Sequence, residues 1–398
     1  MVPSARVSDL AEQVRGVTYG KDDASRTPAS GYLPILRAGN ITDVGLVFDD
    51  LVYVPAAKVS AKQKIKQGDI VIAASSGSID VVGKAAPALR AFEGGFGAFC
   101  KVIRPNDKVD AGYLAQFFKT PNYRRTISSL AAGANINNLK SEHLDDLLVP
   151  LPALPEQRRI AAILDQADAL RAKRRETLAQ LDSLTQSIFI EMFGDYRTAC
   201  VPWPIRPVED IAAEMTIGLV RSAAEFGPDF EVPYVRMNAI GQRGEFLPNL
   251  VMRTAVNESE FERYQLRPGD LLFNTRNSRE LVGKTALFRE SGRYVFNNNL
   301  MRIRFRDGVH PEYVAAAFQT PYIQQELASR KAGTTSVFAI YARELKTVPV
   351  PVPPLSLQET FATRIQAVES LKTTHRAATA ELDALFASLQ HRAFSGGL

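Results

Sequence analysis

The sequence has 398 residues but only two cysteines and four histidines. Two cysteines are too few for a disulfide framework or a thiolate metal site, and the histidines show no metal-ligand spacing. No apolar run approaches the roughly 18 residues that a membrane span needs, and residues 1–16 lack the apolar core of a signal peptide. We therefore expect a cytoplasmic protein without a metal site, in which Cys100 and Cys200 are ordinary structural thiols.

Catalytic and nucleotide-binding motifs are also scarce. The segments "VVGKA" and "LVGKT" resemble the end of a phosphate-binding loop, but Ser78 and Ser278 occupy the positions where that loop needs its first glycine. The glycine cluster "EGGFGAF" at 93–99 is typical of a turn, and "FGPDFEV" at 226–232 lacks the lysine of a nuclease site. The Asn/Asp-Pro-Pro-aromatic sequence of amino-methyltransferases is missing as well. The sequence therefore predicts a protein that is not an enzyme.

The charge is moderately basic, with a net charge of +5 and a pI near 9.1. This balance fits a partner that carries phosphates, but many proteins that never bind nucleic acid share it. Because no tract of lysine and arginine suggests a disordered basic arm, any nucleic-acid surface must be assembled by folding.

The chain contains an internal repeat with a period of about 200 residues. Five pairs of segments recur in the same order: "LRAGNIT" and "VRMNAIG", "QGDIVI" and "PGDLLF", "VGKAA" and "VGKTA", "YLAQFFKTPNY" and "YVAAAFQTPYI", and "PLPALPEQ" and "PVPPLSLQ". Five ordered matches at nearly one spacing are hard to obtain by chance. The chain is therefore two copies of one unit.

Each copy begins with short β-type runs and one clear helical pattern and ends in a helix that starts after several prolines. This order predicts an α+β fold with two globular domains, at 1–153 and 195–353, and two long helices, at 154–194 and 354–398. Roughly 38 helical residues would span about 57 Å. We expect the helices to pair antiparallel as a coiled coil, which would relate the domains by a pseudo-twofold axis. The alternative is that each helix packs on its own domain.

Apolar residues three and four apart predict the seam of this coiled coil. The predicted seam residues are Ile160, Ile163, Leu170, Arg174, Leu181, Leu184, Leu371, His375, Leu382 and Leu385. Arg174 and His375 occupy equivalent positions, where a polar residue costs stability but can fix the register of the helices.

Loop-like stretches of both copies hold side chains suited to DNA. Arginine can bond guanine bidentately and asparagine adenine, whereas lysine and serine mostly meet phosphates. In the first copy the candidates are Arg37, Asn40, Ser75, Ser76, Ser78, Lys84, Asn135, Asn137, Asn138 and Lys140. In the second they are Arg236, Asn238, Arg243, Arg276, Asn277, Arg279, Lys284, Asn297, Asn298, Thr334, Thr335 and Ser336. The copies share their frame and differ in these loops, as expected if each reads a different sequence.

Two variable domains, each followed by a "PLPxLxEQ" type of helix start, resemble the specificity subunit of type I restriction-modification enzymes. The resemblance covers essentially the whole chain and is most specific at "VPLPALPEQRRIAAIL" and "EMFGD". The second copy departs from it, with Leu357 where the first has Glu156.

The resemblance implies two target recognition domains that each read one half of a bipartite, asymmetric site in double-stranded DNA. It also implies two methyltransferase subunits docked on the helices and, in some systems, restriction subunits. No cofactor is expected in this chain; S-adenosylmethionine and ATP with Mg are expected on the partners. Two other interpretations stay open: a two-lobed scaffold that does not bind DNA, and a self-contained restriction or modification enzyme.

Overall fold

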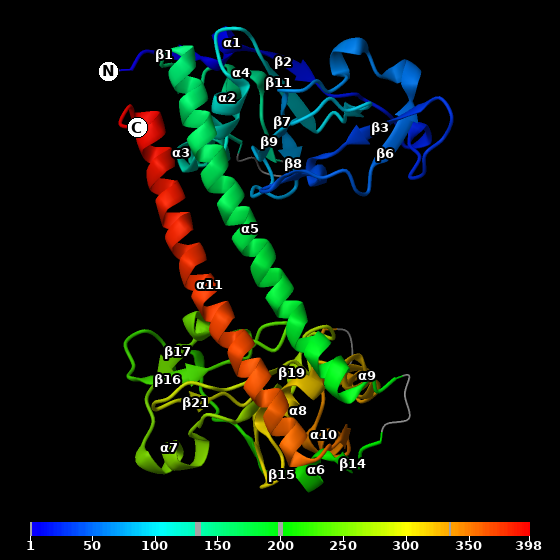
Figure 1. Cartoon of the computed structure of the whole chain (residues 1–398), viewed down its shortest axis with the longest axis vertical. Coiled ribbons are helices and arrows are strands. Elements are labelled where there is room, and N and C mark those ends of the chain that lie inside the picture. Colours follow the sequence, from blue (N-terminus) through cyan, green and yellow to red (C-terminus); the bar gives the residue numbers. More distant parts are fainter. Residues whose placement is uncertain (1, 132–136, 198–201, 334–335) are drawn as a thin grey trace. The chain divides into compact units, whose positions relative to one another are not determined.

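The computed structural model describes residues 2–131, 137–197, 202–333 and 336–398 (Figure 1). The chain forms two compact units, one of Met1–Glu176 with Ala377–Leu398 and one of Thr177–Arg376. Each unit holds one α+β domain together with a segment of both long helices. The boundary between the units therefore falls inside the helices, whereas the sequence suggested a division before and after them.

The first unit is built on a four-stranded antiparallel sheet in the order β2-β11-β7-β9, beside a three-stranded sheet in the order β10-β3-β6. Its strands are β1 (Ser4–Arg6), β2 (Ala11–Arg15), β3 (Tyr32–Leu36), β4 (Ile41–Thr42), β5 (Gly45–Leu46), β6 (Val52–Pro55), β7 (Ile70–Ala73), β8 (Ser75–Ser76), β9 (Ala85–Pro87), β10 (Gly95–Phe96), β11 (Cys100–Pro105), β12 (Asn137–Asn138) and β13 (Leu148–Pro150). Its helices are α1 (Val7–Leu10), α2 (Ala111–Phe117), α3 (Pro121–Ala131), α4 (Ser141–Asp145) and the first part of α5 (Leu154–Phe193).

The second unit repeats this plan, with a four-stranded sheet in the order β15-β22-β18-β20 and a three-stranded sheet in the order β17-β16-β21. Its strands are β14 (Ile205–Pro207), β15 (Ala212–Ile217), β16 (Val232–Val235), β17 (Met252–Thr254), β18 (Leu271–Asn274), β19 (Arg276–Asn277), β20 (Thr285–Leu287), β21 (Val295–Phe296), β22 (Leu300–Phe305), β23 (Ala332–Gly333), β24 (Phe338–Ala339) and β25 (Pro349–Pro351). Its helices are α6 (Val208–Ile211), α7 (Glu258–Tyr264), α8 (Pro311–Phe318), α9 (Pro321–Ser329), α10 (Ala342–Lys346) and the first part of α11 (Leu355–Ser395). The prediction of an α+β fold is confirmed.

The motifs shared by the two copies are structural. The aspartate of "QGD", Asp69, is 1% exposed and pairs with Arg104 at 2.8 Å. Its counterpart Asp270 pairs with Arg304 at 2.7 Å. In "FQTPY" the hydroxyl oxygen of Thr320 accepts a hydrogen bond from the N–H of the third residue of α9, which is N-capping, and a proline follows at the first helical position. The repeat therefore preserves residues that hold the frame together.

A buried glutamine anchors the start of each long helix to its domain. The Gln157 side chain donates to the carbonyl of Pro152 at 2.8 Å and accepts from the N–H of Asp110 at 2.8 Å. Gln358 likewise donates to the carbonyl of Pro353 at 2.7 Å and accepts from the N–H of His310 at 2.8 Å. Both side chains are buried. The glutamine of "PEQ" and "SLQ" thus explains why this part of the motif survives in both copies.

In the first unit α5 and α11 are joined by an ion pair. The Nε of Arg171 lies 2.5 Å from a carboxylate oxygen of Asp383, and Arg171 also bonds Asp168 at 2.9 Å. The Arg171 guanidinium covers the ring of Phe386, whose centroid lies 4.2 Å from the central carbon. Phe386 belongs to the main hydrophobic core of this unit, so the end of the chain completes the core of the N-terminal domain.

In the second unit the two helices are joined by the equivalent ion pair. The amine of Lys372 lies 3.2 Å from Asp182 and 2.9 Å from Glu369. Further along, Arg364 lies 3.3 Å from Glu191. As the residue number rises on α5 it falls on α11, so the helices are antiparallel here. Lys372 is 6% exposed although it is charged.

The contact stripe differs from the predicted seam by one residue at alternate positions. Ile160 is buried in the first core, but Ile163 is only partly buried and Arg174 is exposed. Four of the leucines predicted for the seam are exposed: Leu170 at 53%, Leu184 at 38%, Leu371 at 51% and Leu385 at 53%. Their assignment to the seam is wrong. The neighbouring residues Arg171, Lys372 and Phe386 lie in the contact instead, because the two charges have carboxylate partners on the facing helix.

This register makes a prediction about two adjacent residues. Replacing Phe386 with alanine should lower the free energy of unfolding by about 3–5 kcal/mol, because a packed core ring is lost. Replacing Leu385 with alanine should change it by less than about 0.5 kcal/mol, because that side chain is exposed. Urea unfolding followed by circular dichroism measures both. Equal effects would contradict the register.

Candidate nucleic-acid interface

In the first unit two of the predicted recognition loops meet. Strand β8 pairs antiparallel with β12, so that Ser75 lies opposite Asn138 and Ser76 opposite Asn137. The N–H of Leu139 also donates to the carbonyl of Ala74 at 2.8 Å. Segments separated by some 60 residues in the sequence are therefore brought into one small ladder. Asn138 and Lys140, and Ser78 in the loop after β8, are exposed.

In the second unit the corresponding loops meet in the same way. Strand β19 pairs with β24, so that Arg276 lies opposite Ala339 and Asn277 opposite Phe338. Arg276 and Arg279 are both exposed, and the Arg279 guanidinium lies 5.7 Å from the centroid of the Phe338 ring. This arrangement presents two cations where the first unit presents serine and asparagine.

The two lysines of the "VGK" motif lie next to these ladders but contact protein groups. Lys84 lies 3.2 Å from the carboxylate of Asp43. Lys284 donates to the carbonyl of Ile240 at 2.7 Å, and burial lowers the pKa of its amine. The main chains of both lysines bond the strand that precedes the ladder, because the carbonyls of Lys84 and Lys284 accept from the N–H groups of Ala73 and Asn274.

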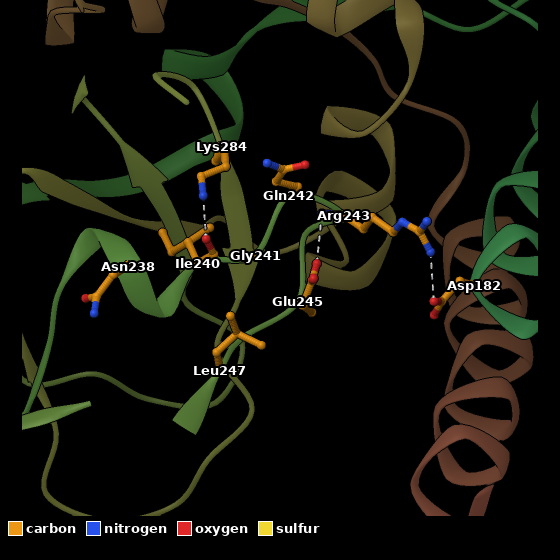
Figure 2. A pocket seen from close by; sticks show the side chains of 9 residues that line it. All are labelled: Asp182, Asn238, Ile240, Gly241, Gln242, Arg243, Glu245, Leu247 and Lys284. Atoms are coloured by element: carbon orange, nitrogen blue, oxygen red, sulfur yellow. Dashed lines mark hydrogen bonds and ion pairs between the residues drawn. The ribbon is translucent and has the colours of Figure 1, made fainter. Parts of the chain in front are cut away.

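A shallow hollow of about 470 Å³ in the second unit brings three predicted DNA-binding residues together, as Figure 2 shows. Asn238, Arg243 and Lys284 line it together with residues 240–242, 245 and 247 and Asp182 of α5. Arg243 reaches Asp182 at 3.0 Å, so the recognition loop is bonded to the same carboxylate that holds Lys372. Sequence patterns do not indicate this contact, because Arg243 and Asp182 belong to different parts of the repeat.

Two predicted base-reading residues are buried, and for them the prediction is wrong. Asn40 is 4% exposed; its side-chain oxygen accepts from the N–H of Arg37 at 2.8 Å, and its amide donates to the carbonyl of Asp49 at 2.7 Å. It therefore caps a tight turn. Asn297 is 7% exposed, in the loop before β22. Neither side chain can reach a base edge, because protein covers it.

The other candidates fall into three groups: cations that contact protein groups, exposed side chains, and residues whose side chains are not described. Arg37 bonds the carboxylate of Asp50 at 2.5 Å, and the Arg236 guanidinium lies over the ring of Phe226 at 4.6 Å. Asn298 and Ser336 are exposed. Asn135, Thr334 and Thr335 lie outside the described residues, and only the backbone of Asn137 is described.

Burial also settles the character of one cysteine. It raises the pKa of the Cys100 thiol to about 12, so the thiol stays protonated near neutral pH. Cys200 lies outside the described residues. In the described part of the chain no cluster of His, Cys, Asp and Glu is arranged to hold a metal ion, and no helix is both long and apolar enough to cross a membrane.

The buried asparagine can be tested against an exposed one. Replacing Asn40 with alanine should lower the free energy of unfolding by about 1–3 kcal/mol, because the cap and the partner of a buried carbonyl are lost. Replacing Asn238, which is exposed, should cost less than about 0.5 kcal/mol. Thermal unfolding measures the difference. An Asn40→Ala protein that is fully stable but binds DNA poorly would restore Asn40 as a base-reading residue.

Comparisons with known proteins agree with this architecture. The family described as "Type I restriction modification DNA specificity domain" matches twice, at residues 4–181 and 201–384. The EcoKI specificity subunit of Escherichia coli K12 is 33% identical over 99% of this chain and 88% of its own length. The StySPI specificity subunit of Salmonella potsdam is 30% identical over 99% of this chain and 89% of its own length.

Solved structures show the same fold. The crystal structure of a type I restriction-modification S subunit from M. genitalium has a TM-score of 0.58 at 14% identity, covering 98% of this chain and 96% of that one. A chain from a study of the assembly and conformational transition of a type I R-M system has a TM-score of 0.54 at 18% identity and full coverage of both chains. On its sequence matches along both halves, this chain belongs to the family of type I restriction-modification DNA specificity subunits.

Proposed function

We propose that this chain is the non-catalytic, DNA-reading subunit of a type I restriction-modification complex, and that each domain reads one half of a bipartite, asymmetric sequence in double-stranded DNA. The observation that carries the proposal is the pair of equivalent ladders with different exposed side chains. β8 and β12 offer serine and asparagine, whereas β19 and its loop offer Arg276 and Arg279. To read two different half-sites, two domains with the same backbone frame must present different side chains to the DNA.

The proposal assigns methyl transfer and cleavage to partner subunits. S-adenosylmethionine would bind the methyltransferase subunits, and ATP with Mg would bind restriction subunits where these are present. The scarcity of catalytic motifs in the sequence supports this division. A scaffold unrelated to DNA is the main alternative; it would lack the steep decrease of DNA affinity with salt that phosphate contacts cause.

The exposed leucines of the long helices are the proposed contacts for two methyltransferase subunits. In the first unit Leu170 of α5 and Leu385 of α11 each come directly before a residue of the helix contact, Arg171 and Phe386. In the second unit Leu371 comes directly before Lys372 of the helix contact, and Leu184 is the counterpart of Leu385 in the repeat. Each unit thus carries one equivalent pair of apolar side chains on its helices, which fits one partner for each unit.

The function is tested by expressing the chain with the methyltransferase subunit of its own system in a host free of DNA methylation. Single-molecule sequencing then maps the modified adenines. We expect one bipartite motif that is absent when this chain is omitted. If both proteins are soluble and bound to each other but no DNA is methylated, the proposed function is wrong.

The proposed contact with the methyltransferase subunits is tested by the double variant Leu170→Asp with Leu385→Asp. It should retain its unfolding midpoint, because both side chains are exposed, and it should bind one methyltransferase subunit where the original chain binds two. Mass measurement of the purified complex gives the number of subunits. An unchanged number would show that these leucines are not the contact.

If the helices set the spacing of the two half-sites, a longer pair should lengthen the unread gap. Seven residues inserted after Gln180 and seven inserted after Thr373 lie between the two ion pairs on both helices, so they preserve the heptad and both pairs. They add about 10 Å, or about three base pairs. Methylation mapping should show both half-sites unchanged and a gap longer by about three. An unchanged gap in an active variant would rule out this role, and insertion in one helix alone should abolish activity.

A further inference from the structure

The first unit displays an aromatic side chain on a rigid turn next to the β8 ladder. The turn is closed by the N–H of Cys100, which donates to the carbonyl of Gly97 at 2.8 Å. The carbonyl of Phe99 accepts from the N–H of Ala74 at 2.8 Å and from that of Ser75 at 3.0 Å. The backbone at this point is therefore held on both sides. The ring of Phe99 is nevertheless 67% exposed.

A close backbone approach fixes the place of this turn. A Cβ atom on Gly16 would lie 2.0 Å from the carbonyl oxygen of Gly97, so only glycine permits the contact. The second unit uses the same device, because a Cβ atom on Gly218 would lie 2.4 Å from the carbonyl oxygen of Asn297. The two turns are therefore the same structural element.

The two turns differ in the side chains that they present. In the second unit the N–H of Leu300 donates to the carbonyl of Asn297 at 2.9 Å, and the carbonyl of Asn299 accepts from Thr275. The tip of that turn is Asn298 and Asn299, both polar, where the first unit has an alanine and Phe99. The backbone of the turn is the same in both units, but its exposed side chains are amides in the second unit and apolar in the first. The exposed side chains of the β8–β12 and β19–β24 ladders differ between the units as well.

The position of the turn connects Phe99 to the candidate interface. Its carbonyl binds the N–H groups that lead into β8, and the preceding residue, Ala73, donates to the carbonyl of Lys84 at 2.9 Å. Lys84, whose cation suits phosphate, and Phe99, whose ring is exposed, are thus hydrogen-bonded through their carbonyls to the successive residues Ala73 and Ala74. Among side chains that meet base edges in the major groove, apolar ones contact the methyl group of thymine.

We propose that Phe99 reads the first domain's half-site by contact with a thymine methyl group, whereas the second domain uses amide side chains at the same point of its frame. This inference rests on the proposed DNA-reading function. It adds a specificity-determining residue that the sequence pattern did not reveal, because a phenylalanine between Ala98 and Cys100 resembles an ordinary core residue.

The test uses the complex of the chain with its methyltransferase subunits and a duplex carrying the mapped motif. Each thymine of both half-sites is replaced in turn by uracil, which lacks only the methyl group. We expect a loss of affinity of about fourfold at one position, the worth of one methyl-sized group. In Phe99→Ala this preference should disappear, with an overall loss on the order of tenfold.

Two variants complete the experiment. Asn299→Ala, the matched change in the second domain, should retain the preference for thymine at that position. Phe99→Asn, which carries the side chain of the second domain, should lose it and provides a second variant should the alanine protein fold poorly. A preference that persists in both Phe99 variants would overturn the proposal, as would indifference of the original complex to every replacement. Failure of the proposed function is a separate result, since no bipartite motif would then have been found.

Discussion

The arrangement of the long helices depends on two charges that lie in the contact between them. Arg171 meets Asp383 in one unit, and Lys372 meets Asp182 in the other. The side chains of the two cations are only 16% and 8% exposed. A buried charge without its partner costs about 3–5 kcal/mol, so a shift of one helix along the other is strongly disfavoured. An apolar stripe alone would permit such shifts, because one heptad looks much like the next. The charges therefore contribute a defined register more than they contribute stability.

That register has consequences for how the chain folds. The last residues of α11 complete the core of the N-terminal domain, where the rings of Phe394 and Tyr113 lie 5.0 Å apart. The second unit is closed in the same manner by the end of α5, whose Phe189 and Phe193 lie against Phe361 of α11. The first unit combines two separate stretches of the chain, one of which is the end of α11. The first unit can reach its full core only after the whole chain has been made, while the second is continuous in sequence.

Much of this architecture follows from the sequence alone. The repeat, the proline-marked helix starts and the alternation of short strands with turns all lie in local patterns, and the α+β fold was predicted from them. The register of the helix pair could not be obtained from hydrophobicity, because stripes beginning at Ile160 can continue through Ile163 and Leu170 or through the adjacent positions. Leucine is more apolar than arginine, so the pattern favoured the wrong stripe. The signal that resolves it is electrostatic: Arg171 and Lys372 are equivalent in the repeat, and so are Asp182 and Asp383.

The recognition loops were harder to interpret, because one residue type serves two purposes. Asn40 and Asn138 are both loop asparagines, yet one caps a turn in the protein interior and the other is exposed beside a serine ladder. Local sequence does not separate them, since the capping partner of Asn40 at Asp49 is itself a loop residue.

In each domain, the residues that stabilise the fold are therefore distinct from the residues that are free to contact DNA. Residues that hold the frame are buried: Gln157 and Asp69 are held by hydrogen bonds and an ion pair, and Gly16 lies against the backbone of Gly97. Residues at the tips of the ladders and turns have side chains that the fold does not use. A change at Phe99 or Arg276 therefore removes little packing, whereas a change at the frame loses a hydrogen bond or forces the backbone apart. Such a domain can alter what it contacts without losing its stability, provided that its glycines, caps and buried ion pairs stay in place.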